Sequence, residues 1–189
     1  MKLFSIFIIF LFIAAPTLAG EVVIVKNVIN GYTLELTDGR KVTLLGVATP
    51  GLERDEKAKE QAKAWKMHVN DVVTLGIEAK DFLEGMIKHW PGSQVRLEYK
   101  KDPFPGQKEL QAFVFQDTGF TMAKEEYQVD WMILPLDHYE WFDGKYSRFH
   151  NATIIKAGYS DAHEGIGKYD ALFLSLRDEA KKMKRGLWR

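Results

Sequence analysis

The chain has 189 residues, a length that suits one domain with a substantial core. Hydrophobic residues make up 46% of it and charged residues 28%, a balance that excludes a disordered chain. It contains no cysteine, which excludes disulfides, thiol catalysis and a lipid-modified cysteine. The 26 basic and 26 acidic residues balance, so the net charge does not favour a phosphate polymer as partner.

Residues 1–19 have the pattern of an export signal peptide. The positive residue Lys2 precedes an apolar run from Leu3 to Ala15, and small residues then lead to Gly20. The run is short for a membrane span and no later segment is apolar enough to be one. We therefore expect cleavage before Gly20 and an exported protein, periplasmic or secreted, with one mature domain at 20–189. A retained anchor is the alternative.

The mature chain begins with the pattern of short antiparallel strands. Residues 22–45 combine β-branched residues with leucines that alternate with polar residues. Within them, Asp38-Gly39 is a strong hairpin signal. Alternation at 95–99 and 112–115 predicts further strands.

Helical spacing of apolar residues occurs in three places. It predicts a helix between Glu53 and Val73, a second helix that follows Gly76, and a long last helix that has its apolar face from Tyr169 to Met183 and ends near Gly186. Residues 120–150 have no clear period, and we expect a β-rich or loop-rich elaboration there.

Two segments have the turn and strand pattern of a small secreted nuclease. Asn30 to Thr33 is a turn that opens a strand, and Leu45 to Gly51 is a strand closed by Thr49-Pro50. With further segments in the same order, the chain resembles the staphylococcal nuclease family. Those segments are Val28 to Leu34, Val42 to Pro50, Gly76 to Ala79, Val95 to Tyr99, Asn151 to Tyr159 and Glu179 to Trp188.

The resemblance implies an α+β fold. We expect a five-stranded OB-type β-barrel with about three helices. Relative to the family, the chain has insertions at about 52–75 and 116–150. The implied activity is calcium-dependent hydrolysis of phosphodiester bonds in DNA or RNA. In this chemistry two aspartates hold the metal, a glutamate positions or deprotonates water, and two arginines stabilise charge on the phosphate.

The residues at these family positions do not suit the chemistry. Tyr32 and Ala48 replace the metal-binding aspartates, and Thr49 keeps only a backbone carbonyl for calcium. Gly51 stands at the position of the glutamate, and Thr43 at that of the first arginine. Glu109 stands at the position of the second arginine, or Lys108 does in the alternative alignment. We therefore predict no cofactor, and calcium only if the protein is a working nuclease.

Neighbouring residues could restore part of the site. Lys41 shares a strand face with Thr43 and could meet a phosphate. Glu53 and Asp55 could turn a carboxylate toward the vacated positions. The alternative is that these two acids begin a helix, where negative charge favours the first turn.

Aromatic residues gather in the second insertion. On an OB-type barrel, exposed aromatics stack on bases or sugars, so Trp131 and Trp141 are binding candidates together with Lys41 and Lys108. The alternative is that the aromatics fill a core beneath the insertion. Asn151 is expected to cap a helix. The five histidines have no zinc-binding spacing.

Three functional hypotheses follow. The leading one is an exported, catalytically inactive member of the family that acts as a binding or envelope-associated module, with nucleic acid or another polymer as a partner. The first alternative is a secreted calcium-dependent nuclease. The second is a protein–protein interaction domain that uses the aromatic insertion.

Overall fold

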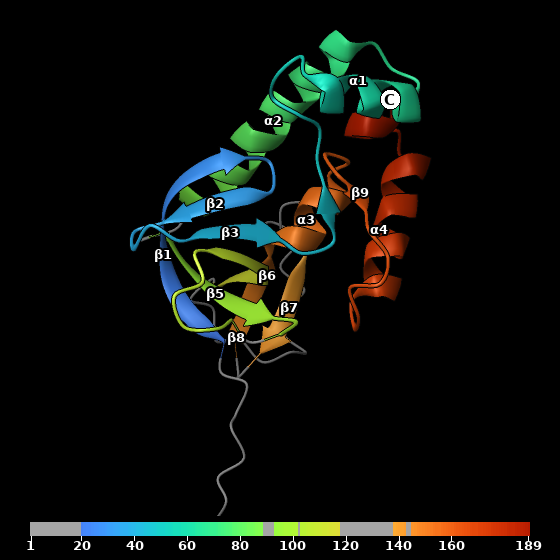
Figure 1. Ribbon diagram of the computed structural model, residues 1–189. Helices are drawn as coiled ribbons and strands as arrows, with labels where there is room; N and C mark the ends of the chain where they lie inside the picture. The colour runs from blue at the N-terminus through green and yellow to red at the C-terminus, as the bar shows by residue number, and fades with distance from the viewer. Residues whose placement is uncertain (1–19, 89–92, 102, 118–137, 143–144) are drawn as a thin grey trace, which may run out of the picture.

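The computed structural model describes residues 20–88, 93–101, 103–117, 138–142 and 145–189 (Figure 1). The expected signal peptide and Trp131 lie outside these residues. The strands are β1 (Glu21–Asn30), β2 (Thr33–Leu36), β3 (Lys41–Leu44), β4 (Val47–Ala48), β5 (Gln94–Tyr99), β6 (Glu109–Asp117), β7 (Tyr139–Phe142), β8 (Lys145–Phe149) and β9 (Asp161–Ala162). The α-helices are α1 (Glu56–Trp65), α2 (Val69–Lys88), α3 (His150–Lys156) and α4 (Asp170–Lys182).

Five strands close into a barrel, which confirms the predicted α+β fold with an OB-type barrel. β1 pairs antiparallel with β2 and β5, β2 with β3, and β5 with β6. The parallel pairing of β3 with β6 completes the circle, with Lys41 opposite Glu109 and Leu44 opposite Ala112. Every barrel strand therefore has a neighbour on both sides, and no barrel edge is left open.

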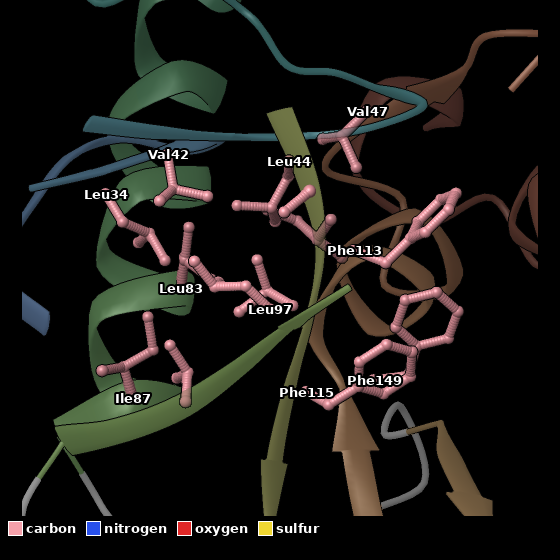
Figure 2. Close-up of a cluster of buried hydrophobic side chains, with 14 of the residues drawn as sticks. Leu34, Val42, Leu44, Val47, Leu83, Ile87, Leu97, Phe113, Phe115 and Phe149 are labelled. Atoms are coloured by element: carbon pink, nitrogen blue, oxygen red, sulfur yellow. The ribbon is translucent and has the colours of Figure 1, made fainter. Parts of the chain in front are cut away.

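Alternation along the strands fills the barrel with aliphatic side chains. In β3, Val42 and Leu44 are buried, whereas Lys41 is exposed and Thr43 half-buried. Leu83 and Ile87 of α2 point among the strand residues and pack with them in one core (Figure 2). The helix thus supplies part of the core that the short strands cannot provide alone.

The first two helices differ from the sequence prediction in their bounds. α1 ends where Lys66 adopts a left-handed conformation, with φ of 55°, and α2 begins at Val69. Gly76 lies inside α2 instead of preceding it. A Cβ at Gly76 would lie 2.1 Å from the carbonyl oxygen of Gly51, so this glycine lets α2 contact the loop after β4. The predicted boundary at Gly76 was wrong because close packing, not a turn, requires the glycine.

Asn151 also differs from its predicted role. It lies within α3, is fully buried, and does not cap the helix. Its Oδ1 accepts the N–H of Val114 at 2.8 Å, and its Nδ2 donates to the carbonyl oxygens of Leu45 at 2.8 Å and Ala112 at 3.3 Å. The side chain therefore fastens α3 to β6 and to the residue that follows β3.

The end of the second insertion extends the sheet beyond the barrel. β8 pairs with β6, and β7 pairs with β8. The rings of Phe115 and Phe149 stack there with centroids 4.4 Å apart. Trp141 lies in β7, but its side chain is outside the description. The last helix is found where it was predicted, but it ends at Lys182 instead of near Gly186. Among the described residues, no helix is both long and apolar enough to cross a membrane.

Candidate functional site

The three expected metal positions come together in one pocket. Tyr32, Ala48 and Thr49 line a cavity of about 460 Å³, whose other walls come from α1 and β9. Asn30 accepts the N–H of Tyr32 at 3.0 Å and so holds the turn between β1 and β2, as an asparagine in a turn is expected to do. We call this cavity the α1–β9 pocket.

A short two-stranded sheet builds the wall opposite α1. Ala48 of β4 lies opposite Asp161 of β9, and the N–H of Ala48 donates to Oγ of Ser160 at 2.8 Å. This pairing brings Asp161 and His163 to the pocket lining. The strand that carries one expected metal position thus also places a carboxylate and an imidazole beside it.

Lys57 of α1 supplies a positive charge at the first metal position. Its ammonium donates to the phenol oxygen of Tyr32 at 3.1 Å, and it lies 5.1 Å from the centre of the Tyr32 ring. A lysine and a phenol therefore stand where the family resemblance implies an aspartate and a cation.

Gln61, one helical turn further along α1, binds the loop that contains Thr49 and Gly51. Its Nε2 donates to the carbonyl oxygen of Thr49 at 3.0 Å, and its Oε1 accepts the N–H of Gly51 at 3.0 Å. The Thr49 carbonyl oxygen, which was the group left for calcium at this position, therefore already accepts a hydrogen bond from Gln61. Gln61 also joins α1 to the same loop that Gly76 contacts from α2.

The donor groups of the pocket do not fit calcium. Calcium takes roughly six to eight oxygen ligands, several of them carboxylates. Glu60 and Asp161 line the pocket, but the Lys57 ammonium opposes a cation there. In the described part of the chain, no three or more His, Cys, Asp or Glu residues are grouped to hold a metal ion.

The expected phosphate-binding positions lie elsewhere. Thr43 and Glu109 line a second pocket of about 850 Å³ beneath the loop between β5 and β6. Lys41 is exposed and opposite Glu109, and its N–H donates to the carbonyl oxygen of Lys108 at 2.7 Å. Lys108 itself lines a third pocket. Positions expected in one site are thus spread over several pockets.

The two acids that could have restored the site do not line the α1–β9 pocket. Asp55 is the N-cap of α1, where its Oδ1 accepts the N–H of Ala58 at 2.8 Å. Glu53 is exposed. For Asp55, the interpretation as the start of a helix is confirmed.

Sequence reasoning missed the residues that α1 and β9 bring to the pocket. Lys57, Glu60, Gln61 and Trp65 fall within the first insertion, where alignment to the family gave no positions. A signal was present, since their spacing places them on one helix face. Asp161 and His163 carry no comparable signal, because in the sequence they resemble an ordinary loop before the last helix.

A scan against models of protein families finds no model that matches this chain, and a search of the curated proteins finds no match either. The resemblance to the staphylococcal nuclease family therefore rests on the ordered segments quoted above. Membership of that family is a proposal, and the residues of the pocket decide what the chain can do.

Proposed function

We propose that the protein is an exported, catalytically inactive member of the staphylococcal nuclease family that acts as a binding module. One observation carries the proposal. Lys57 and Gln61 bind the residues at two expected metal positions, Tyr32 and Thr49, and Gln61 also binds Gly51 at the expected glutamate position.

The loss extends to every part of the expected chemistry. Ala48 and Gly51 carry no carboxylate, and the arginine positions are held by Thr43 and Glu109. Removing a single group that stabilises a transition state costs on the order of 10²–10³ in rate. Several such losses leave no route to calcium-dependent hydrolysis.

The pocket suits binding because it combines apolar, aromatic and polar walls. Tyr32 and Trp65 supply aromatic rings, both half-buried, and Val47 supplies an apolar side chain. Small-molecule sites are commonly concave, mainly apolar and provided with a few placed polar groups. The cavity retains this character although its catalytic groups are replaced.

The test is to incubate purified residues 20–189 with single- and double-stranded DNA and RNA, in calcium and in chelator. We expect no cleavage in either condition and no heat of calcium binding by calorimetry. A matched variant that combines Tyr32→Asp and Ala48→Asp with Lys57→Ala should gain measurable calcium binding, which shows that the assay detects a repaired site. Chelator-sensitive cleavage by the unmodified protein that survives repurification would establish the nuclease alternative instead.

A further inference from the structure

The α1–β9 pocket carries charges of both signs that have no ion-pair partner among the described residues. We propose that it binds a zwitterion, namely a free amino acid or a dipeptide. This inference rests on the proposed function, because it names the ligand of the same pocket.

The helix α1 contains three pairs of opposite charge three residues apart (Glu56 and Lys59, Lys57 and Glu60, Glu60 and Lys63), and in the described structure only one of them forms an ion pair. Glu56 and Lys59 form an ion pair of 2.5 Å on the exposed side. Lys57 and Glu60 are also three residues apart, yet both line the pocket and, among the described residues, neither has an ion pair. The Lys57 ammonium instead reaches Tyr32.

The opposite wall adds a second carboxylate without a cationic partner in the described part of the chain. Oδ1 of Asp161 accepts the N–H of Ala162 at 2.8 Å, which fixes the orientation of the carboxylate. The pocket therefore presents one ammonium, from Lys57, and two carboxylates, from Glu60 and Asp161.

This charge pattern selects among classes of ligand. A polyanion is attracted by the Lys57 ammonium but repelled by two carboxylates, and a simple cation is attracted by the two carboxylates but repelled by the ammonium. A ligand with one carboxylate and one ammonium satisfies both walls. Its carboxylate binds Lys57 and the Tyr32 hydroxyl, while its ammonium lies between Glu60 and Asp161.

The walls are held in place before a ligand arrives. Ala58 and Ala62 of α1 pack with Val72 of α2 in a small buried cluster, and Trp65 packs against it. Gln61 fastens the helix to the loop after β4. A cavity of about 460 Å³ lies within the size range of small-ligand sites and is large enough for a dipeptide.

Calorimetry and ¹⁵N NMR of the Trp65 indole test the inference. The probes are the twenty standard amino acids, a set of dipeptides, and the N-acetylated and C-amidated forms of the tightest of them. We expect at least one unblocked probe to bind with a dissociation constant of about 1 mM or tighter, and either block to weaken binding at least about tenfold.

Variants separate the two ends of the ligand. In Lys57→Met, the amidated and free-carboxylate forms should bind alike, and in Glu60→Gln with Asp161→Asn, the acetylated and free-amine forms should bind alike. The control Glu56→Gln with Lys59→Met, on the outer side of α1, should bind as the unmodified protein does.

Two results overturn the inference. One is that no amino acid or dipeptide binds; the other is that blocking either end leaves the affinity of the unmodified protein unchanged. Both leave the proposed function standing, because that proposal is decided by calcium binding and chelator-sensitive cleavage.

Discussion

The barrel interior and the α1–β9 pocket are held together by different forces. Inside the barrel, Leu34 and Leu97 have no exposed surface and gain their stabilisation from burial, at about 25 cal/mol for each Å² of apolar surface. In the pocket, Tyr32 and Lys57 are joined by one exposed hydrogen bond, which is worth about 0.5 kcal/mol or less. Pocket residues can therefore change while the barrel persists.

The segment from Leu45 to Gly51 joins the two regions and is fastened from both. Asn151, in the core, binds the carbonyl oxygen of Leu45, and Gln61, in the pocket wall, binds Thr49 and Gly51. Substitutions at the two ends of this segment compare a buried polar contact with a partly exposed one.

The largest effect is expected from Asn151→Ala. The change leaves the N–H of Val114 and the carbonyl of Leu45 without their partner, and unsatisfied buried groups cost about 1–3 kcal/mol each, so we expect a loss of about 4 kcal/mol in the free energy of unfolding. Urea unfolding followed by circular dichroism measures it. Asn30→Ala is the control, because it removes one part-buried hydrogen bond and should cost about 1 kcal/mol. Equal losses would show that the buried hydrogen bonds of Asn151 stabilise the fold no more than the part-buried one of Asn30.

The second effect is an acid sensitivity that belongs to the core. His150 is fully buried, and neither ring nitrogen has a hydrogen-bond partner in the described part of the chain. Burial, together with the charge of Arg148, lowers the pKa of His150 from 6.5 to about 3. Because the folded-state pKa is the lower one, the unfolded chain takes up the proton first as pH falls, and stability present above pH 6.5 is lost toward pH 3.

As the pH falls through this range, His150 alone should thus lower the free energy of unfolding by about 1.4 kcal/mol for each pH unit. Thermal unfolding between pH 7 and pH 4 measures the slope. His150→Leu should remove most of this contribution, whereas His163→Leu, on the exposed pocket wall, should leave it in place. An unchanged slope in His150→Leu would assign the acid sensitivity to carboxylates instead.

The barrel was predictable from sequence because its strands carry local signals. Leucines and valines alternate in β2 and β3, and the Asp38-Gly39 turn fixes the hairpin between them. Asn151 was not predictable in its role. Its partners Leu45 and Val114 lie far away along the chain, and an asparagine near a helix start is most simply a cap.

The pocket was predictable only in part. Tyr32, Ala48 and Thr49 were expected near one another, and they do line one cavity. Lys57, Glu60 and Gln61 come from the first insertion. The helical stripe there indicates which face of α1 is buried, but it does not indicate which part of the barrel the opposite face lies against. The packing of α2 against the loop after β4 depends on the absent side chain of Gly76, which sequence alone presents as a helix breaker.

A smaller effect is expected from Gln61→Leu. The change removes both hydrogen bonds to the loop of Thr49 and Gly51 but keeps the packing volume, so we expect a loss of about 1–2 kcal/mol. Hydrogen exchange of the Gly51 amide should show the loop opening locally. Gln107→Leu is the matched control, because Gln107 makes two similar bonds across the exposed loop between β5 and β6, and it should cost about 0.5 kcal/mol or less.

The smallest effect is expected from separating Tyr32 and Lys57. Tyr32→Phe keeps the ring against the core, and Lys57→Met keeps the stem of the side chain, so each change should alter the free energy of unfolding by about 0.5 kcal/mol or less. Thermal unfolding of both variants and of the double variant measures this. A loss above about 2 kcal/mol would place the pair among the structural contacts of the fold. A small loss shows that the exposed pair contributes little to the fold, so that its charge and hydroxyl are free to act on the ligand proposed above.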